Sequence, residues 1–258
     1  MESIAYFASD FHLGAPDERS SKEREQRVVD WLNFISKDAT HLFLVGDVFD
    51  FWFEYKRVVP KGFLRIQAKI AQLVDKGIEV HLFRGNHDMW MFDYFEKELG
   101  VKIHADELEI ELNQTKIRLA HGDGVGAGDR TYKIIKKIFR SKVSQWFFAR
   151  IHPNFGLSLA QYFSKSSRKK TGHLDEEFKG LQFEYIYQYL KKNHPQLQAD
   201  AYIFGHRHLP LQIKEENLQY INLGDWIIFN SYVKFSRNDW ELLQWKDSKP
   251  FPLTSSHI

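Results

Sequence analysis

Residues 79–88 read EVHLFRGNHD, an apolar run followed directly by the polar motif Gly85-Asn86-His87-Asp88. Residues 41–50, HLFLVGDVFD, repeat this arrangement, with Gly46-Asp47 after the apolar run. Three further motifs also end or follow an apolar run: Asp10-Phe11-His12, His121-Gly122-Asp123 and Gly205-His206-Arg207-His208. Because such runs predict β-strands, we expect all five motifs at strand ends, where a sheet presents side chains to a cleft.

The rest of the chain alternates between strand and helix patterns. Apolar periodicity predicts strands at residues 4–8, 41–45, 79–83, 108–112, 116–120, 201–204 and 220–223, and helices at 23–35, 63–76, 91–99 and about 175–192. This alternation predicts an α/β domain whose sheet lies between helices. With 258 residues and 43% apolar content, the chain can bury one sizeable core.

One stretch, residues 128–173, breaks the alternation, and we predict a basic helical insertion there between two parts of the main domain, 1–127 and 174–258. From Arg130 to His173 the chain has eleven Lys and Arg and no Asp or Glu, which leaves 25 bases and 34 acids elsewhere, about −9. Apolar residues recur with helical period over 131–140, and apolar segments follow at 143–151 and 157–163. Such charge segregation favours an anion-binding surface, whereas a solvated helical hairpin packed on the core is the alternative.

Composition also bounds the location of the protein. The chain contains no Cys, which excludes disulfides and thiolate metal sites and fits a reducing compartment. The first residues lack the basic and apolar regions of a signal peptide, and no run reaches the roughly 18 apolar residues that span a bilayer. We therefore expect a cytoplasmic protein, with contact to a membrane surface left open.

The five motifs supply the side chains that hard divalent ions prefer when they handle phosphate. Asp10 and His12 lie two residues apart and can chelate one ion, and Asp47 is placed to bridge two ions. Asn86 offers a neutral amide oxygen. Histidines 206 and 121 would complete the second ion and His208 the first. We expect structural roles for the remaining histidines, His41, His81, His104, His152, His194 and His257.

The ordered motif set D-x-H, G-D-x-x-D, G-N-H-D, H-G-D and G-H-x-H resembles that of the calcineurin-like metallophosphoesterases. The resemblance implies a four-layer α/β/β/α sandwich with two ions, commonly manganese and otherwise iron or zinc, bridged by an Asp and a hydroxide that attacks phosphorus. It assigns one ion to Asp10, His12, Asp47 and His208, and the other to Asp47, Asn86, His121 and His206.

In that family the His of G-N-H-D, here His87, protonates the leaving oxygen or steadies charge in the transition state. The resemblance gives Asp88 the task of orienting His87, and we expect the carboxylate to raise the pKa of the imidazole. Asp50 and Asp123 are candidates for holding the ligand imidazoles, although Asp50 also suits a turn.

Residues 9–15 (SDFHLGA), residues 222–226 (NLGDW) and the basic, aromatic insertion resemble the UDP-2,3-diacylglucosamine pyrophosphohydrolases of lipid A synthesis. These enzymes cleave a diphosphate to UMP and a lipid 1-phosphate at the inner membrane surface, beneath a helical lid that receives the acyl chains. The resemblance implies substrate contacts by Asn86, His87, Asp129, Tyr132, Ser164, Arg168 and His206. The better-known branch of that family has Arg at the position of His87, which leaves the exact substrate open.

The make-up of the insertion fits such a lipid. Arg168, Lys169 and Lys170 would meet the diphosphate, and the acyl cleft would be lined by Ile135, Phe139, Trp146, Phe147 and Phe148. None of the expected metal ligands lies in the insertion, so we expect the metal site to assemble without it.

Two other classes compete with this interpretation. A nuclease or nucleotide phosphodiesterase would use the same ions, but here the bases alternate with apolar residues, which favours an interface over a nucleic-acid track. A non-catalytic membrane or partner-binding module would not need a complete metal set, and no obligate protein partner is indicated.

Overall fold

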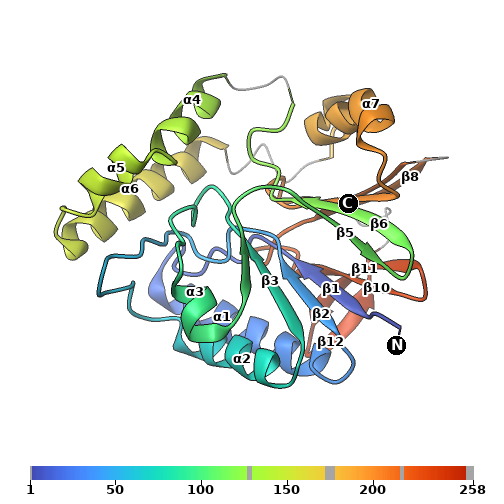
Figure 1. Cartoon of the computed structure of the whole chain (residues 1–258), viewed down its shortest axis with the longest axis horizontal. Coiled ribbons are helices and arrows are strands. Elements are labelled where there is room, and N and C mark those ends of the chain that lie inside the picture. The colour runs from blue at the N-terminus through green and yellow to red at the C-terminus, as the bar shows by residue number, and fades with distance from the viewer. Residues whose placement is uncertain (1, 127–129, 172–177, 216–217, 254–258) are drawn as a thin grey trace.

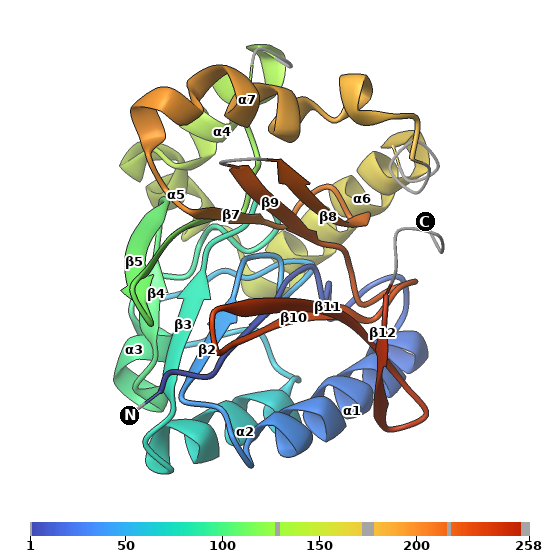
Figure 2. The ribbon, with the colours of Figure 1, turned by 90° about the vertical axis from the view of Figure 1, so that its right-hand side faces the viewer.

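In the computed structural model, which describes residues 2–126, 130–171, 178–215 and 218–253, two stacked β-sheets lie between layers of helices (Figures 1 and 2). Three clusters of buried apolar side chains pack the layers against one another. The first packs α1 and α2 on one sheet, the second fills the space between the sheets, and the third packs α7 on the other sheet. The α/β/β/α sandwich expected from the sequence is therefore confirmed.

The larger sheet has the strand order β12-β11-β10-β1-β2-β3-β4. Its parallel part comprises β1 (Ala5–Ala8), β2 (His41–Leu44), β3 (Glu79–Phe83) and β4 (Lys102–His104). On the other side of β1 the sheet continues with three antiparallel strands, β10 (Ser231–Ser236), β11 (Asp239–Lys246) and β12 (Lys249–Pro252). The parallel pairs bring the carboxyl ends of β1, β2 and β3 to one edge.

The smaller sheet has the strand order β5-β6-β7-β9-β8. It consists of β5 (Leu108–Leu112), β6 (Thr115–Ala120), β7 (Ala201–Phe204), β8 (Pro210–Glu215) and β9 (Leu218–Leu223). Strands β6 and β7 run parallel, so the motifs that follow them also come together. Strands β5 and β6 form an antiparallel pair, at almost the bounds predicted from the sequence, 108–112 and 116–120.

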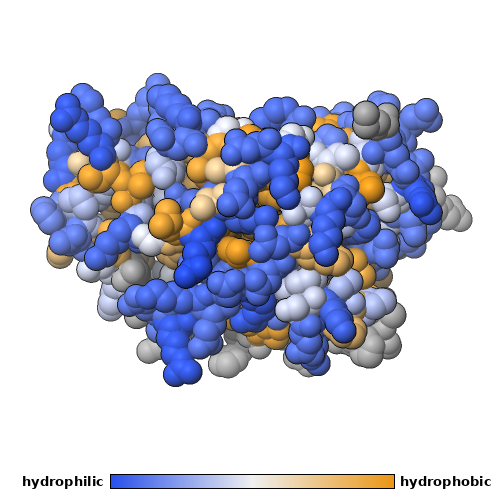
Figure 3. Space-filling view, turned by 90° about the horizontal axis from the view of Figure 1, so that it is seen from below, coloured by the Kyte–Doolittle hydropathy of each residue, from blue (hydrophilic) through white to orange (hydrophobic). Residues whose placement is uncertain are grey.

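The helices cover the outer faces of the two sheets. They are α1 (Glu18–Ile35), α2 (Leu64–Asp75), the short α3 (Tyr94–Leu99) and α7 (Tyr185–Leu197). Helix α1 begins at Asp17, whose carboxylate accepts the backbone N–H of Ser20 at 2.9 Å, and its buried face carries Trp31, Leu32 and Ile35. The face of the molecule seen in Figure 3 is mostly hydrophilic, with separate apolar patches.

Helices α4 (Arg130–Phe139), α5 (Lys142–Phe148) and α6 (Pro153–Thr171) lie beside the sandwich (Figure 1); we call them the helical segment. Phe148 attaches it to the core, because its ring centroid lies 4.7 Å from those of both Phe53 and Trp90. The indole N–H of Trp90 also donates to the Phe139 carbonyl at 2.8 Å. The expected domain boundaries, at 127/128 and 173/174, lie outside the described residues.

The bounds of three predicted helices are wrong. Helix α1 begins at Glu18 rather than at residue 23, and α3 begins at Tyr94 rather than at residue 91. The largest difference concerns α7. The sequence predicts a helix over about 175–192, but α7 begins only at Tyr185 and continues to Leu197. Gly180 has a φ of 104°, a left-handed conformation that ends any helix passing through it, and a 3₁₀ turn, η1 (Leu181–Phe183), follows. Among the described residues, none of the helices has the length and apolar character needed to cross a membrane.

Candidate metal centre

The expected metal ligands all follow strand ends, and the two sheets bring them together. Five of these residues have left-handed backbones, with φ of 57° at Asp10, 43° at His12, 52° at Asp47, 67° at His206 and 58° at His208. This conformation costs a residue other than glycine on the order of 1–2 kcal/mol. Strain of this kind, repeated within one group of neighbouring side chains, is typical of a functional site.

Gly85 shows why the motifs need glycine. A Cβ at this position would lie 2.1 Å from Asp47 Oδ1 and 2.5 Å from the Asp47 nitrogen, far inside van der Waals contact. The backbone of the loop after β3 therefore approaches the loop after β2 as closely as it can. This contact also lets the His87 N–H donate to Asp47 Oδ1 at 2.8 Å, which fixes that carboxylate.

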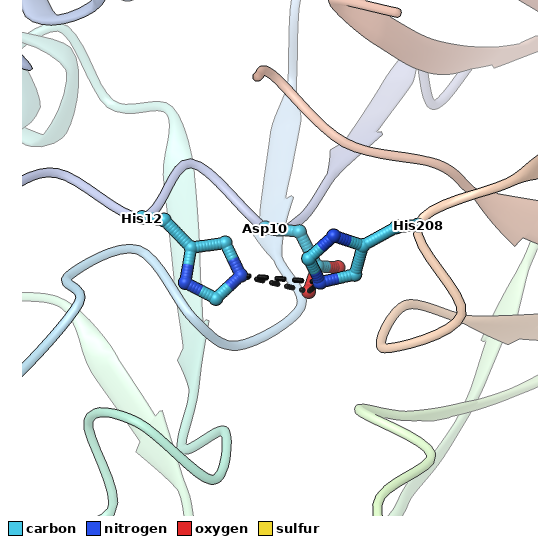
Figure 4. A group of neighbouring side chains, drawn as sticks. All are labelled: Asp10, His12 and His208. Atoms are coloured by element: carbon cyan, nitrogen blue, oxygen red, sulfur yellow. Dashed lines mark hydrogen bonds and ion pairs between the residues drawn. The ribbon is translucent and has the colours of Figure 1, made fainter. Parts of the chain in front are cut away.

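Asp10, His12 and His208 form the first ligand group (Figure 4). His208 Nε2 lies 3.2 Å from both His12 Nε2 and Asp10 Oδ1, and His12 Nε2 lies 3.6 Å from Asp10 Oδ1. Donor atoms that surround one ion at about 2.1 Å are themselves roughly 3 to 3.5 Å apart. The spacing in this group therefore fits a shared ion.

The second ligand group meets the first at Asp47. Asp47 Oδ2 lies 3.3 Å from His121 Nε2 and 3.7 Å from His12 Nε2, so this carboxylate faces both groups. His121 Nε2 also lies 3.2 Å from Asn86 Oδ1, and the rings of His121 and His206 have centroids 5.1 Å apart. All seven expected metal ligands therefore lie in one continuous cluster.

The charges in the cluster depend on one another. Burial would raise the pKa values of Asp10 and Asp47, but the surrounding imidazoles outweigh burial and hold both well below the ordinary range. Burial would lower the pKa values of His12 and His121, yet the neighbouring carboxylates raise them to about 9 and about 10. At His206, burial prevails with the help of His121 and lowers the pKa to about 4.

The donor set fits divalent cations. Asp10 Oδ1 is fully buried and makes no hydrogen bond within the part of the chain that the structure describes. Buried carboxylate oxygens are normally satisfied, so an oxygen that instead faces two imidazole nitrogens indicates an ion. Oxygen and imidazole ligands with no thiolate suit manganese, iron or zinc.

Outer residues hold several ligand imidazoles in place. His121 Nδ1 lies 2.9 Å from the Val45 carbonyl, and His208 Nδ1 lies 3.6 Å from Asp225 Oδ2. Asp225 is itself fixed by the backbone N–H groups of Ile228 and Phe229, at 2.9 and 3.0 Å. Asp225 belongs to the sequence NLGDW at 222–226, for which no metal-site role was predicted; its position just after an apolar run is the signal in the sequence that indicates one.

The contacts of His87 differ from those expected. Its Nδ1 lies 3.1 Å from the Asp50 carbonyl and 3.5 Å from Asp50 Oδ1. Asp88 instead accepts backbone N–H groups, from Gly85 at 2.8 Å, Phe49 at 3.2 Å and Asp47 at 3.3 Å. Among the described residues, Asp50 thus lies beside His87, where we expected Asp88. Asp88 instead joins the loop after β2 to the loop after β3.

The expected pKa shift of His87 is also wrong. Burial lowers the pKa of this imidazole, and the carboxylates of Asp47 and Asp50 do not compensate. Because Nδ1 faces a carbonyl, which can only accept, the neutral ring carries its proton there. Burial and Asp47 also raise the pKa of Asp88 to about 7, so Asp88 is a poor anionic partner.

Several residues of the insertion that were expected to contact the substrate lie outside the described part of the chain, and the others differ in their burial. Asp129 lies outside the described residues, as do the side chains of Tyr132, Arg168, Lys169, Lys170 and Ile135. Ser164 is buried, and its hydroxyl is 2.9 and 3.0 Å from the two carboxylate oxygens of Asp50. Phe148 packs into the aromatic attachment, whereas Trp146 and Phe147 are more than half exposed.

The sequence model of the calcineurin-like phosphoesterase family matches residues 5–210. The chain belongs to this family. It is 38% identical over 249 residues to UDP-2,3-diacylglucosamine hydrolase of Porphyromonas gingivalis, covering 90% of this chain and 94% of the relative. It is 26% identical over 226 residues to the enzyme of that name from Haemophilus influenzae, covering 86% and 90%. The family and these relatives make the protein a hydrolase.

Among solved structures, vacuolar protein sorting 29 from Cryptosporidium parvum aligns with a TM-score of 0.51. The alignment covers 97% of this chain and 95% of the other at 11% identity, so the likeness concerns the fold alone.

Proposed function

We propose that the protein hydrolyses the diphosphate of UDP-2,3-diacylglucosamine to UMP and a lipid 1-phosphate, with two divalent ions, manganese foremost. The observation that carries the proposal is the convergence of seven ligand side chains at Asp47, beside His87 and a helical segment with exposed apolar residues. The named relatives, one of them 38% identical, support this substrate.

The ions would supply a nucleophile from water and neutralise the charge of the diphosphate. The protein's own residues place the reacting groups. Asp47 would set the distance between the two ions, and Asn86 would add a neutral ligand that leaves room for phosphate charge. His87 keeps Nδ1 toward the Asp50 carbonyl, so Nε2 is the nitrogen available to the substrate. A bound diphosphate raises the pKa of a nearby imidazole, which would let His87 protonate the leaving oxygen.

The helical segment would receive the lipid part. Ile134, Val143, Trp146 and Phe147 are each more than half exposed, which is unusual for residues of this size outside an interface. The Arg150 guanidinium stacks 3.6 Å over the Trp146 ring centroid. Apolar residues mixed with bases suit acyl chains next to phosphates. We therefore propose peripheral contact with the inner face of the membrane that carries the substrate.

The test is a substrate panel assayed with purified protein and added Mn²⁺. UDP-2,3-diacylglucosamine should yield UMP far faster than UDP-N-acetylglucosamine yields any product, while an oligonucleotide should stay intact. Phe147→Ala should lower lipid turnover by roughly 5- to 150-fold, the equivalent of about 1–3 kcal/mol for one buried apolar side chain. The control Phe251→Ala removes an exposed phenylalanine from β12 and should have no effect.

Two results would count against the proposal. Equal turnover of the lipid substrate by Phe147→Ala and the parent would remove the helical segment from lipid recognition. Cleavage of the oligonucleotide in preference to the lipid would instead make the protein a nuclease of the same family.

A further inference from the structure

Two polar side chains of the helical segment reach carboxylates that stand next to metal ligands. The first is Lys136 on α4. Its ammonium lies 2.5 Å from Asp123 Oδ2 and donates to the Asp123 carbonyl at 2.8 Å. Asp123 is buried, two residues after His121, and interacts electrostatically with both His121 and His206. Lys136 therefore binds a carboxylate that interacts electrostatically with the second ligand group.

The other side chain is Ser164 on α6. Besides its two contacts with the Asp50 carboxylate, its hydroxyl lies 3.4 Å from His87 Nδ1. Asp50 Oδ1 lies 3.6 Å from His12 Nδ1 and 3.5 Å from His87 Nδ1. Ser164 therefore binds the carboxylate that faces both a ligand of the first group and the candidate proton donor.

We propose that Lys136 and Ser164 are positioning residues that couple docking of the helical segment to assembly of the metal centre, one residue for each ligand group. The inference rests on the metal centre of the proposed function, but not on the lipid substrate. It replaces the expectation that the metal site assembles independently of the insertion.

The physical reason is that each carboxylate has two tasks. Asp50 and Asp123 are buried. A rotamer that turned either carboxylate away from the imidazoles would therefore leave its charge without a partner and without hydration. At Asp50, the contact with Ser164 fixes a carboxylate whose Oδ1 faces His12 and His87. At Asp123, the ion pair with Lys136 fixes a carboxylate two residues from His121. Because linkage is reciprocal, ions that order these histidines must in turn favour the docked helical segment.

The test uses Lys136→Met and Ser164→Ala with two matched controls. Lys137→Met removes an exposed lysine of α4, and Ser158→Ala removes an exposed serine of α6 whose hydroxyl donates to the Asn154 carbonyl of the same helix. Calorimetric titration of metal-free protein with Mn²⁺ should show one of two sites weakened by about 10- to 100-fold in each test variant, the usual effect of losing an outer partner of a ligand. Both controls should bind like the parent.

Two further measurements separate positioning from a general loss of structure. Lys136→Arg should restore most of the affinity that Lys136→Met loses. In the unaltered protein, Mn²⁺ should slow tryptic cleavage at the exposed Lys133, Lys137 and Lys142 of the helical segment. This measurement needs no variant, so it holds even if a test variant fails to fold.

Parent-like Mn²⁺ affinity in both test variants, or cleavage that is indifferent to Mn²⁺, would overturn the inference. Its failure is distinguishable from failure of the proposed function, because Mn²⁺ binding and cleavage are read without the lipid. A protein with the coupling but no turnover of UDP-2,3-diacylglucosamine would keep the inference and lose the substrate.

Discussion

His87 combines a partly buried imidazole, a carbonyl partner at Nδ1 and a position next to Asp47. We predict that His87→Ala keeps both ions but loses about 10²- to 10⁴-fold in turnover, the range of general acid catalysis. Metal analysis alongside kinetics on a small chromogenic phosphodiester measures both effects. His87, His12 and Asp47 also lie close enough to share an ion, so a variant that loses one ion would make His87 a ligand instead.

The sequence predicts which side chains gather in one cluster, because spacing fixes which side chains leave a strand end together. It predicts their partners poorly. Asp88 follows His87 directly, yet its side chain accepts three backbone N–H groups, while Asp50, 37 residues earlier, lies at His87. The sign of the His87 pKa shift was missed for a related reason: the depth of burial depends on packing that no local motif contains.

The loop after β7, which carries His206 and His208, is held by contacts with two other elements. Gly205-His206-Arg207-His208 follows β7, and the Asn222 amide of β9 donates to the Gly205 carbonyl at 2.7 Å. Arg207 forms a two-pronged ion pair with Glu184, at 3.1 Å for both Nε and the terminal nitrogen. Both side chains are buried, and Glu184 directly precedes α7.

We predict that Arg207→Met lowers the free energy of unfolding by about 3–5 kcal/mol, because it leaves Glu184 as an unpaired buried charge. Urea unfolding of the metal-free protein measures this loss. The control Lys191→Met breaks the exposed pair with Glu215, whose atoms lie 3.4 Å apart, and should leave the free energy of unfolding close to that of the parent. Equal effects of the two substitutions would show that Arg207 and Glu184 act as an ordinary surface pair.

Strands with a mostly apolar run were predicted, whereas β11 and β12 were not. The runs that became β1 and β7 are buried at every position, and those that became β2 and β3 at every position but the first, as is typical of strands covered on both faces. Strands β11 and β12 lie toward an open edge of the larger sheet, and β12 is exposed along its length, so their apolar signal is weak. They become strands because β11 pairs with β10 and β12 with β11, and such pairing cannot be inferred from the local sequence.

The stability of the whole molecule depends on pH through a histidine buried between the two sheets, as well as through the metal centre. His81 of β3 is buried there, with Nε2 at 2.8 Å from Glu79 Oε1 and Nδ1 at 2.9 Å from His104 Nε2. Its ring also packs on Phe43, with centroids 4.5 Å apart. These contacts give His81 the structural role that the sequence predicted. Burial, His104 and Lys102 outweigh Glu79 and lower the pKa of His81 from 6.5 to about 4.

The sign of the effect follows from proton binding. Below pH 6.5 the unfolded chain binds a proton at residue 81 more tightly than the folded protein does, so stability falls as pH falls and the loss is complete near pH 4. We predict that His81→Phe, which keeps the contact with Phe43, loses less stability than the parent between pH 7 and pH 5, measured as urea midpoints of metal-free protein. The control His152→Phe replaces an exposed histidine and should keep the parent's pH dependence. Should His81→Phe also follow the parent, the acid sensitivity of the fold would belong to groups other than His81.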